Sequence, residues 1–417
     1  MQSEENIKGS TMQPLKMIIE GSFFDSQLYS GRLYLWKTDG SIQIINWDKL
    51  IESITIQPRL RLAFECGFRQ SDYLYGTQWD LIFKDEEIRS LITNKFIQLS
   101  QNPIEVSQSL LKNSEIRHQK NPIGFPHSDL LIYSNRLYVG TGDGIFSTTC
   151  YKENEYPVST RPRKIMDAPV LGLSASYGSL SLSCGSDGLF EMSVKNKMKD
   201  RWNLNSDEDI TDNKAHNLSE LHSSSSRWTF QSIFSSSHHN SGYLADFERE
   251  RDPHPSNYYS ATRKFRRIIS SEEIFAKSSY SWGHQDKLCQ VRDRTITVVQ
   301  FHPWDEENTF LPLGELQLRD FKGEVVTGDS ALFGFIIECD NGIVVMDSNL
   351  ENIWIPGEPV NWRIFSRSKF YENQLHIVYD DRLEIYSFND DYFVNQETKK
   401  AGIKYYEHKG RSRNQNR

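Results

Sequence analysis

Residues 32–45, RLYLWKTDGSIQII, place two alternating apolar runs on either side of an Asp-Gly pair. Alternation with a period of two is typical of a strand with one buried face. Asp and Gly tolerate the positive φ that a two-residue hairpin turn requires. The stretch therefore predicts two neighbouring antiparallel strands joined by a tight turn.

The same unit returns along the chain. Strong copies surround Asp143-Gly144, Asp187-Gly188, Asn341-Gly342 and Asp380-Asp381, and weaker ones lie at Tyr73-Leu74-Tyr75 and Lys287-Leu288-Cys289. Aligned on a shared leucine, the seven copies fall at residues 33, 74, 137, 180, 288, 332 and 375, and four of the six intervals measure 41 to 44 residues. That is the length of a four-stranded blade. A hairpin cannot bury its apolar face alone, so the repeat predicts an all-β propeller of about seven four-stranded blades.

A Trp-Asp pair ends the stretch from Asp39 to Asp48, DGSIQIINWD. In this the chain resembles the WD40-like β-propeller superfamily. The resemblance implies the propeller fold and no binding residues, because Trp79-Asp80 and Trp304-Asp305 fall outside the repeating frame.

The predicted organisation is one propeller over residues 17–398. A flexible segment, residues 1–16, precedes it, and a basic tail, residues 399–417, follows it. Two long intervals between the copies of the repeat predict insertions, one helical and one rich in serine.

The helical insertion is predicted over residues 85–116. Asp85 can cap a helix with an apolar stripe of helical period, and Asn102, Pro103 and Glu105 have the pattern of a second helix start. Two roles stay open: the insertion fills a gap over a blade edge, or it offers a face to a partner.

The second insertion, residues 200–265, is a low-complexity segment with many serines. Such a segment buries too little apolar area to offset its ordering entropy, so we expect much of it to be mobile. Trp228, Phe230, Ile233 and Phe234 leave open that it supplies a strand or a missing blade. The blade count is therefore seven or eight.

Motifs for catalysis and cofactors are missing from the sequence. It has no phosphate-binding loop, no HExxH zinc motif, no nucleophile elbow and no complete calcium loop. His376 and the pairs Asp380-Asp381 and Asp390-Asp391 fit a structural strand position and turns. We predict no catalytic, cofactor or metal-binding residues, and the enzyme alternative is a propeller with a site at its central channel.

Location follows from what the chain lacks. No apolar run is long enough to cross a bilayer, and the first residues are polar. The five cysteines are widely spaced and never form CxxC, which favours reduced thiols. We predict a cytoplasmic protein without membrane contact.

Two basic segments are candidates for contact with nucleic acid or a partner. The formal charge of the chain is −8, yet cations and aromatics gather in both segments, a combination that can neutralise phosphates and stack on bases. A solvated tail is the alternative. The candidate residues are Arg263, Lys264, Arg266, Arg267, Lys404, Tyr405, Tyr406, Lys409, Arg411 and Arg413.

These observations favour a non-catalytic interaction module or scaffold subunit that binds a protein partner. The alternatives are a nucleic-acid-associated subunit and a propeller enzyme. The identity of the partner does not follow from the sequence.

Overall fold

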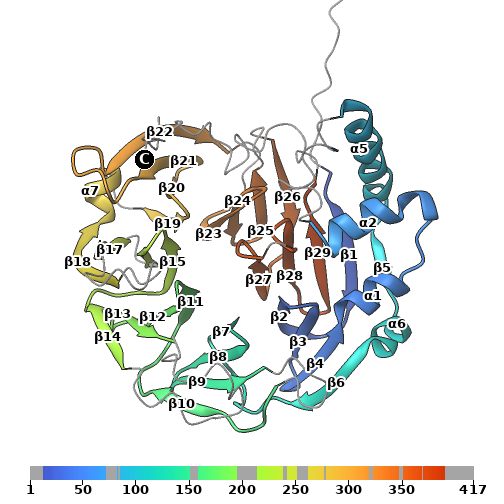
Figure 1. Ribbon diagram of the computed structural model, residues 1–417, viewed down its shortest axis with the longest axis horizontal. Helices are drawn as coiled ribbons and strands as arrows, with labels where there is room; N and C mark the ends of the chain where they lie inside the picture. Colours follow the sequence, from blue (N-terminus) through green and yellow to red (C-terminus); the bar gives the residue numbers. More distant parts are fainter. Residues whose placement is uncertain are drawn as a thin grey trace, which may run out of the picture.

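The computed structural model describes residues 13–71, 82, 85–150, 158–194, 214–237, 242–250, 262–276, 279–318, 323–346, 351–368 and 370–389. Over these residues, seven sheets stand side by side in a ring (Figure 1). Six sheets have four antiparallel strands, and the seventh has a fifth strand. The predicted all-β propeller of about seven four-stranded blades is confirmed, and the described chain contains no eighth blade.

The blades are numbered in chain order, each from its inner to its outer strand. Blade 1 is β2 (Phe23–Tyr29), β3 (Arg32–Lys37), β4 (Ser41–Asn46) and β6 (Glu115–Lys120); blade 2 is β7 (Asp129–Tyr133), β8 (Arg136–Thr141), β9 (Gly144–Thr149) and β10 (Arg163–Met166). Blade 3 is β11 (Gly172–Ser176), β12 (Ser179–Ser183), β13 (Leu189–Ser193) and β14 (Ala215–Ser219); blade 4 is β15 (Ser225–Thr229), β16 (Ser232–Ser236), β17 (Tyr243–Glu250) and β18 (Thr262–Ser270); blade 5 is β19 (Tyr280–His284), β20 (Lys287–Arg292), β21 (Thr295–Phe301) and β22 (Phe310–Gln317). Blade 6 is β23 (Val325–Ala331), β24 (Gly334–Cys339), β25 (Gly342–Met346) and β26 (Asn352–Pro356); blade 7 is β27 (Asn361–Ile364), β28 (Gln374–Val378), β29 (Arg382–Ser387), β1 (Leu15–Glu20) and β5 (Ile104–Val106).

Blade 7 closes the ring with strands from distant parts of the chain. Strand β1 pairs antiparallel with β29, with Leu15 opposite Ser387, and β5 pairs parallel with β1. Leu15 and Lys16, which the sequence assigned to a flexible segment, belong to this strand because Leu15 is buried in the core. Residues 1–12 lie outside the described chain.

The predicted hairpins join the second and third strands of their blades. Gly40 and Gly188 take φ values of 80° and 94° in two of these turns. Five of the aligned leucines lie in second strands, namely Leu33, Leu137, Leu180, Leu288 and Leu375. Leu332 lies in the turn before β24, and Leu74 falls outside the described residues.

Blade 4 comes from the interval predicted as a Ser-rich insertion. Its described part forms β14, the outer strand of blade 3, and β15 to β18, the four strands of blade 4, so this interval supplies one of the seven blades. The mobility of the segment stays a prediction. The composition was misleading because the serines are buried and hydrogen-bonded: Ser181 Oγ lies 2.8 Å from Ser226 Oγ, and Ser236 Oγ donates to Ser281 O. Residues 200–213, 238–241 and 251–261 lie outside the described chain.

The helical insertion connects β4 to β6 and is larger than predicted. It contains α1 (Trp47–Ser53), η1 (Pro58–Leu60), α2 (Arg61–Phe68), α5 (Glu86–Ser100) and α6 (Gln108–Asn113). It begins at Trp47 of the Trp-Asp pair, whose indole Nε1 donates to Phe68 O at 2.7 Å.

The two predicted helix starts differ in outcome. Asp85 caps α5 as expected, accepting from the backbone N–H groups of Glu87 and Ile88. The second start is wrong: Ser107 caps α6, while Glu105 lies in β5. Strand pairing with β1 outcompetes the local capping pattern there.

A continuous core attaches the helices to the ring. Trp47, Phe64 and Phe96 from the insertion share one buried cluster with Leu383 and Ile385 of β29. The insertion is therefore a packed part of the propeller, on the outer side of blade 7 (Figure 1). No helix in the described part of the chain has the length and hydropathy needed to cross a bilayer.

Adjacent blades are linked by tyrosines on one face of the ring. We call it the inner-turn face, because it carries the turns between the first and second strands. The hydroxyls of Tyr371, Tyr29 and Tyr133 accept from the backbone N–H groups of Gly31, Asn135 and Gly178, at 3.2, 3.0 and 3.0 Å. These bonds connect blades 7, 1, 2 and 3 in sequence.

Candidate functional site

The first basic segment lies on β18, the outer strand of blade 4. Arg263 points inward, where its guanidinium carbon lies 3.8 Å from the ring centre of Phe247 and 4.6 Å from that of Trp228. Its Nη2 lies 2.5 Å from Glu191 Oε1. Arg263 is thus a structural residue between blades 3 and 4, and only 11% of its side chain is exposed.

The other three cations of this segment each lie near a carboxylate. Lys264 is 4.0 Å from Glu248, Arg266 is 3.8 Å from Glu306, and Arg267 is 3.9 Å from Asp246. These pairs lower the positive potential that β18 could offer to a phosphate backbone. The candidate residues of the tail, Lys404, Tyr405, Tyr406, Lys409, Arg411 and Arg413, lie outside the described residues.

A network of charges joins the inner strands of three neighbouring blades. Arg363 of β27 contacts Asp25 of β2 through Nε at 3.0 Å and Nη2 at 2.5 Å, and its Nη2 lies 2.7 Å from Asp129 Oδ1 of β7. We call these three residues the Arg363 crossing. It joins blades 7, 1 and 2.

Backbone donors complete the Arg363 crossing. Ser26 N donates to Asp25, and Leu130 N and Leu173 N donate to the two oxygens of Asp129. All four carboxylate oxygens therefore accept a hydrogen bond. Burial alone would lower the pKa of Arg363, but the two carboxylates outweigh it and raise that pKa above its usual value. Such engaged carboxylates are poor candidates for general acid or base work.

Nothing in the sequence marked this crossing as a unit, although a weak signal exists. Asp25 and Asp129 each stand eight residues before an aligned leucine, Leu33 and Leu137. An acid at a constant offset within a repeat would have pointed to the inner strands. Arg363, in contrast, does not stand eight residues before an aligned leucine, so the repeat would not have pointed to it.

A second ion pair crosses the channel closer to the inner-turn face. Arg227 Nε of β15 lies 2.5 Å from Asp329 Oδ2 of β23. The pair reaches from blade 4 to blade 6, past the inner strand of blade 5. Asp329 Oδ1 accepts from Ser330 N at 2.7 Å.

The candidate histidine and carboxylate pairs have structural places. His376 is buried in β28 between Ser26 Oγ and Gln374 Oε1, and burial lowers its pKa to about 3. Asp380 and Asp381 lie in the turn between β28 and β29, as predicted, and Asp390-Asp391 falls outside the described residues. Within the described chain, no cluster of His, Cys, Asp or Glu has the geometry of a metal site.

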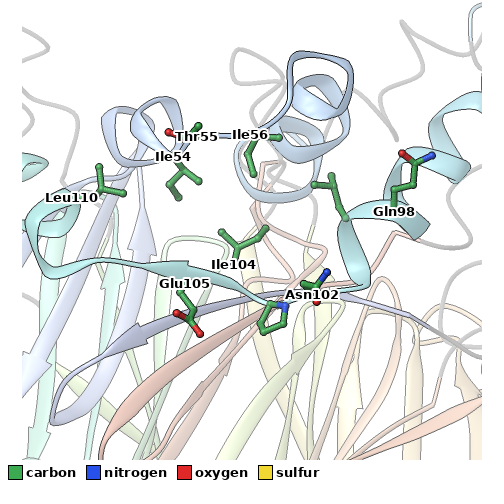
Figure 2. Close-up of a pocket in the computed structure, with 10 residues that line it drawn as sticks. Ile54, Thr55, Ile56, Gln98, Asn102, Ile104, Glu105 and Leu110 are labelled. Atoms are coloured by element: carbon green, nitrogen blue, oxygen red, sulfur yellow. The ribbon is translucent and has the colours of Figure 1, made fainter.

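The helical insertion carries an open groove with a volume of about 440 Å³ (Figure 2). The extended stretch Ile54, Thr55 and Ile56 forms one side, and Ile104 and Glu105 of β5 form the other. The ten lining residues are Ile54, Thr55, Ile56, Gln98, Leu99, Asn102, Pro103, Ile104, Glu105 and Leu110.

Two further features make this groove a candidate binding surface. Strand β5 ends its sheet, so it has a strand neighbour on one side only. The helices around the groove also leave Leu62, Leu91 and Ile97 exposed. The helical insertion was predicted to offer a face to a partner as one of two roles, but the groove itself did not follow from the sequence, because its aliphatic residues come from four separate segments, namely the stretch after α1, α5, β5 and α6.

No protein-family model and no curated protein matches the chain. Solved structures resemble it in overall fold. BBS1N in complex with ARL6DN has a TM-score of 0.48 at 8% identity, over 91% of this chain and 98% of that chain. The β-propeller domain of Cps50 (Swd1) from Myceliophteria thermophila has 0.46 at 9% identity, over 89% and 99%. The WD40 domain of Pan2 from Neurospora crassa has 0.44 at 8%, over 88% and 90%.

Proposed function

We propose that this protein is a non-catalytic interaction module, and that an extended aliphatic segment of a protein partner lies in the groove beside β5. The observation that carries the proposal is the open edge of β5, which borders a groove with aliphatic walls (Figure 2).

An edge strand leaves backbone N–H and C=O groups without a strand partner. A second chain can pair with them in an extended conformation, while pockets for alternate side chains give specificity. An aliphatic side chain of that segment would lie against Ile56, Ile104 and Leu110, which are each partly buried. Removing these surfaces from water favours the complex.

The channel and β18 support this choice over the alternatives. An enzyme site at the channel would need a free acid or base, whereas Asp25, Asp129 and Asp329 each pair with an arginine. A nucleic-acid surface on β18 would need unpaired cations, whereas those side chains lie beside carboxylates. The basic tail, residues 399–417, lies outside the described residues, so contact with nucleic acid through this tail stays a separate proposal.

The test compares the proteins that copurify with two variants from the native host. Ile56→Arg places a charge in the groove, and Leu221→Arg places the same charge at an exposed leucine between blades 3 and 4. We expect Ile56→Arg to lose at least one specific partner that Leu221→Arg retains. An identical set of partners for both variants and the wild type would refute the proposal.

A folding defect in Ile56→Arg would confuse this comparison. Thr55→Arg changes an exposed residue of the same groove wall and serves as the second variant. Thermal unfolding of each variant shows whether the ring is intact.

A further inference from the structure

Trp304 lies in the loop between β21 and β22 of blade 5, and it is 60% exposed. Three other tryptophans of the chain, Trp36, Trp47 and Trp282, are fully buried. An exposed indole keeps a large apolar surface in contact with water, and a partner that covers it gains free energy. Trp304 begins a Trp-Asp pair that lies outside the repeating frame of the sequence, so the repeat does not account for it.

Neighbouring rings hold the indole of Trp304 in place. Phe230, in the turn between β15 and β16 of blade 4, contacts it edge-on with 5.0 Å between the ring centres, and His302 contacts it at 5.7 Å. Phe230 is itself fixed, because its backbone N donates to Gln285 O of blade 5 at 2.8 Å. The rings form a preformed corner on the inner-turn face where blades 4 and 5 meet, so a partner need not order them on binding.

The loop that carries Trp304 closes on itself through hydrogen bonds. His302 N donates to Thr309 O at 2.8 Å, and Asp305 N donates to His302 O at 3.1 Å. Asp305 Oδ1 accepts from the backbone N–H groups two and three residues ahead, at 3.2 and 3.0 Å. These bonds keep residues 304–307 together in one compact turn.

Three consecutive carboxylates follow the indole in this turn. Glu306 and Glu307 are exposed. Hydrogen bonds from the loop backbone lower the pKa of Asp305, so this group is ionised at neutral pH. Among the described residues, Arg266 is the cation paired with these carboxylates, and its Nη2 lies 3.8 Å from Glu306 Oε1. Three negative charges against one positive charge leave the surface beside Trp304 acidic.

An aromatic face beside carboxylates suits a cation. A lysine or arginine side chain gains a cation–π contact with an indole, and its aliphatic stem covers the apolar ring while its charge lies near the acids. The net charge of the chain, −8, also favours the approach of a positively charged segment. A purely apolar side chain would make no use of the carboxylates, and an acidic one would be repelled.

We propose that Trp304 and the carboxylates of residues 305–307, which we call the Trp304 site, bind a lysine or arginine of a basic segment of a protein partner. The proposal rests on the function as an interaction module, but it uses the inner-turn face rather than the groove beside β5.

The probe is a fluorescein-labelled hexapeptide of alternating lysine and glycine, titrated with the full chain at low salt and followed by anisotropy. We expect Trp304→Ala to weaken binding about two- to fivefold, the size of an exposed cation–π contact. Trp304→Phe should restore part of the affinity, because it keeps an aromatic face. Glu306→Gln should weaken binding about twofold, as loss of an exposed charge pair does.

Two matched controls make the same changes elsewhere. Tyr177→Ala removes a half-exposed ring from the inner-turn face of blade 3, where the next two residues, Gly178 and Ser179, are uncharged. Asp293→Asn removes an exposed carboxylate from the turn between β20 and β21. Both should bind the peptide like the wild type. Ile56→Arg should do the same, so failure of the groove proposal and failure of this one are distinguishable.

Three outcomes would overturn the proposal. One is equal binding by the wild type and Trp304→Ala, including no binding by either. Another is an equal loss in Tyr177→Ala, because any exposed ring would then suffice. The third is displacement of the probe by a peptide of alternating leucine and glycine as effectively as by the unlabelled lysine peptide, because the surface would then bind apolar segments. Thermal unfolding shows whether each variant is intact, and if Trp304→Ala does not fold, equal binding by Glu306→Gln and the wild type would overturn the proposal in its place.

Discussion

Two charge clusters on the inner strands of the ring differ in how deeply they are buried. The Arg363 crossing has one arginine for two carboxylates, and every carboxylate oxygen is satisfied within the ring. The pair of Arg227 and Asp329 has one arginine for one carboxylate, and one-third of the Arg227 side chain is exposed. The same residue types thus join blades in both clusters, and burial sets how much each cluster should contribute to stability.

The largest expected effect comes from breaking the Arg363 crossing. Arg363→Met leaves Asp25 and Asp129 without their cation, and Asp25 is fully buried. Removing one partner of a buried ion pair costs about 3–5 kcal/mol of the free energy of unfolding. Urea denaturation measures this loss. A loss below about 1 kcal/mol would show that the crossing does not hold the blades together.

A smaller loss is expected from Arg227→Met. Asp329 then loses its cation but keeps the hydrogen bond from Ser330 N, and Arg227 itself is one-third exposed. An unsatisfied charge of this kind costs about 1–3 kcal/mol. In the same urea titrations, Arg227→Met should therefore lose less free energy of unfolding than Arg363→Met. The reverse order would contradict this prediction.

The third prediction concerns acid and the histidine beside the Arg363 crossing. His127 is buried against Phe24 and Phe125, and neither ring nitrogen has a hydrogen-bond partner among the described residues. Burial first, and then Arg363, lower its pKa to about 4. The folded pKa lies below the unfolded one, so this contribution to stability is present above about pH 6.5 and is lost as the pH falls toward 4.

Replacing His127 isolates this contribution. Between pH 7 and pH 5 the wild type should lose about 2 kcal/mol more stability than His127→Leu, which cannot take up the proton. Urea titrations of both proteins at the two pH values give the difference. Equal losses would mean that the imidazole finds a partner for its proton in the folded ring.

The smallest effect belongs to Arg367. Arg367→Gln, in the loop between β27 and β28, should change the free energy of unfolding by less than about 0.5 kcal/mol, because this residue is exposed. A loss as large as that of Arg227→Met would assign Arg367 to the framework of the ring.

The fold was predictable where the chain repeats itself. Turns such as Asp39-Gly40 and Asp187-Gly188 mark blades because their backbone geometry has few alternatives. The repeat was missed in blade 4, where Ile233 stands in place of the aligned leucine and buried serines surround it in the strand. Composition treats serine as a surface residue, and only the structure places a hydrogen-bond partner such as Ser226 beside Ser181.

The candidate sites were much less predictable. Asp25 and Arg363 are 338 residues apart, and only closure of the ring brings them together. The groove likewise combines Ile56, Ile104 and Leu110 from three elements of the insertion. The basic segment at Arg263 was visible in the sequence, but Glu191, which neutralises that residue, lies in the neighbouring blade.

The position of β1 in blade 7 has a consequence for synthesis on the ribosome. Among the described strands, β1 is the first to be made, and its partner β29 is the last. At roughly 5–20 residues per second, translation of the chain between them takes on the order of tens of seconds. Met17 and Ile19, which end fully buried, must wait that long for the strand that covers them. The nascent chain therefore presents β1 with the edge that later pairs with β29 open throughout this interval, although β5 can pair with the other edge earlier. A chaperone that holds extended segments would find its substrate at that open edge.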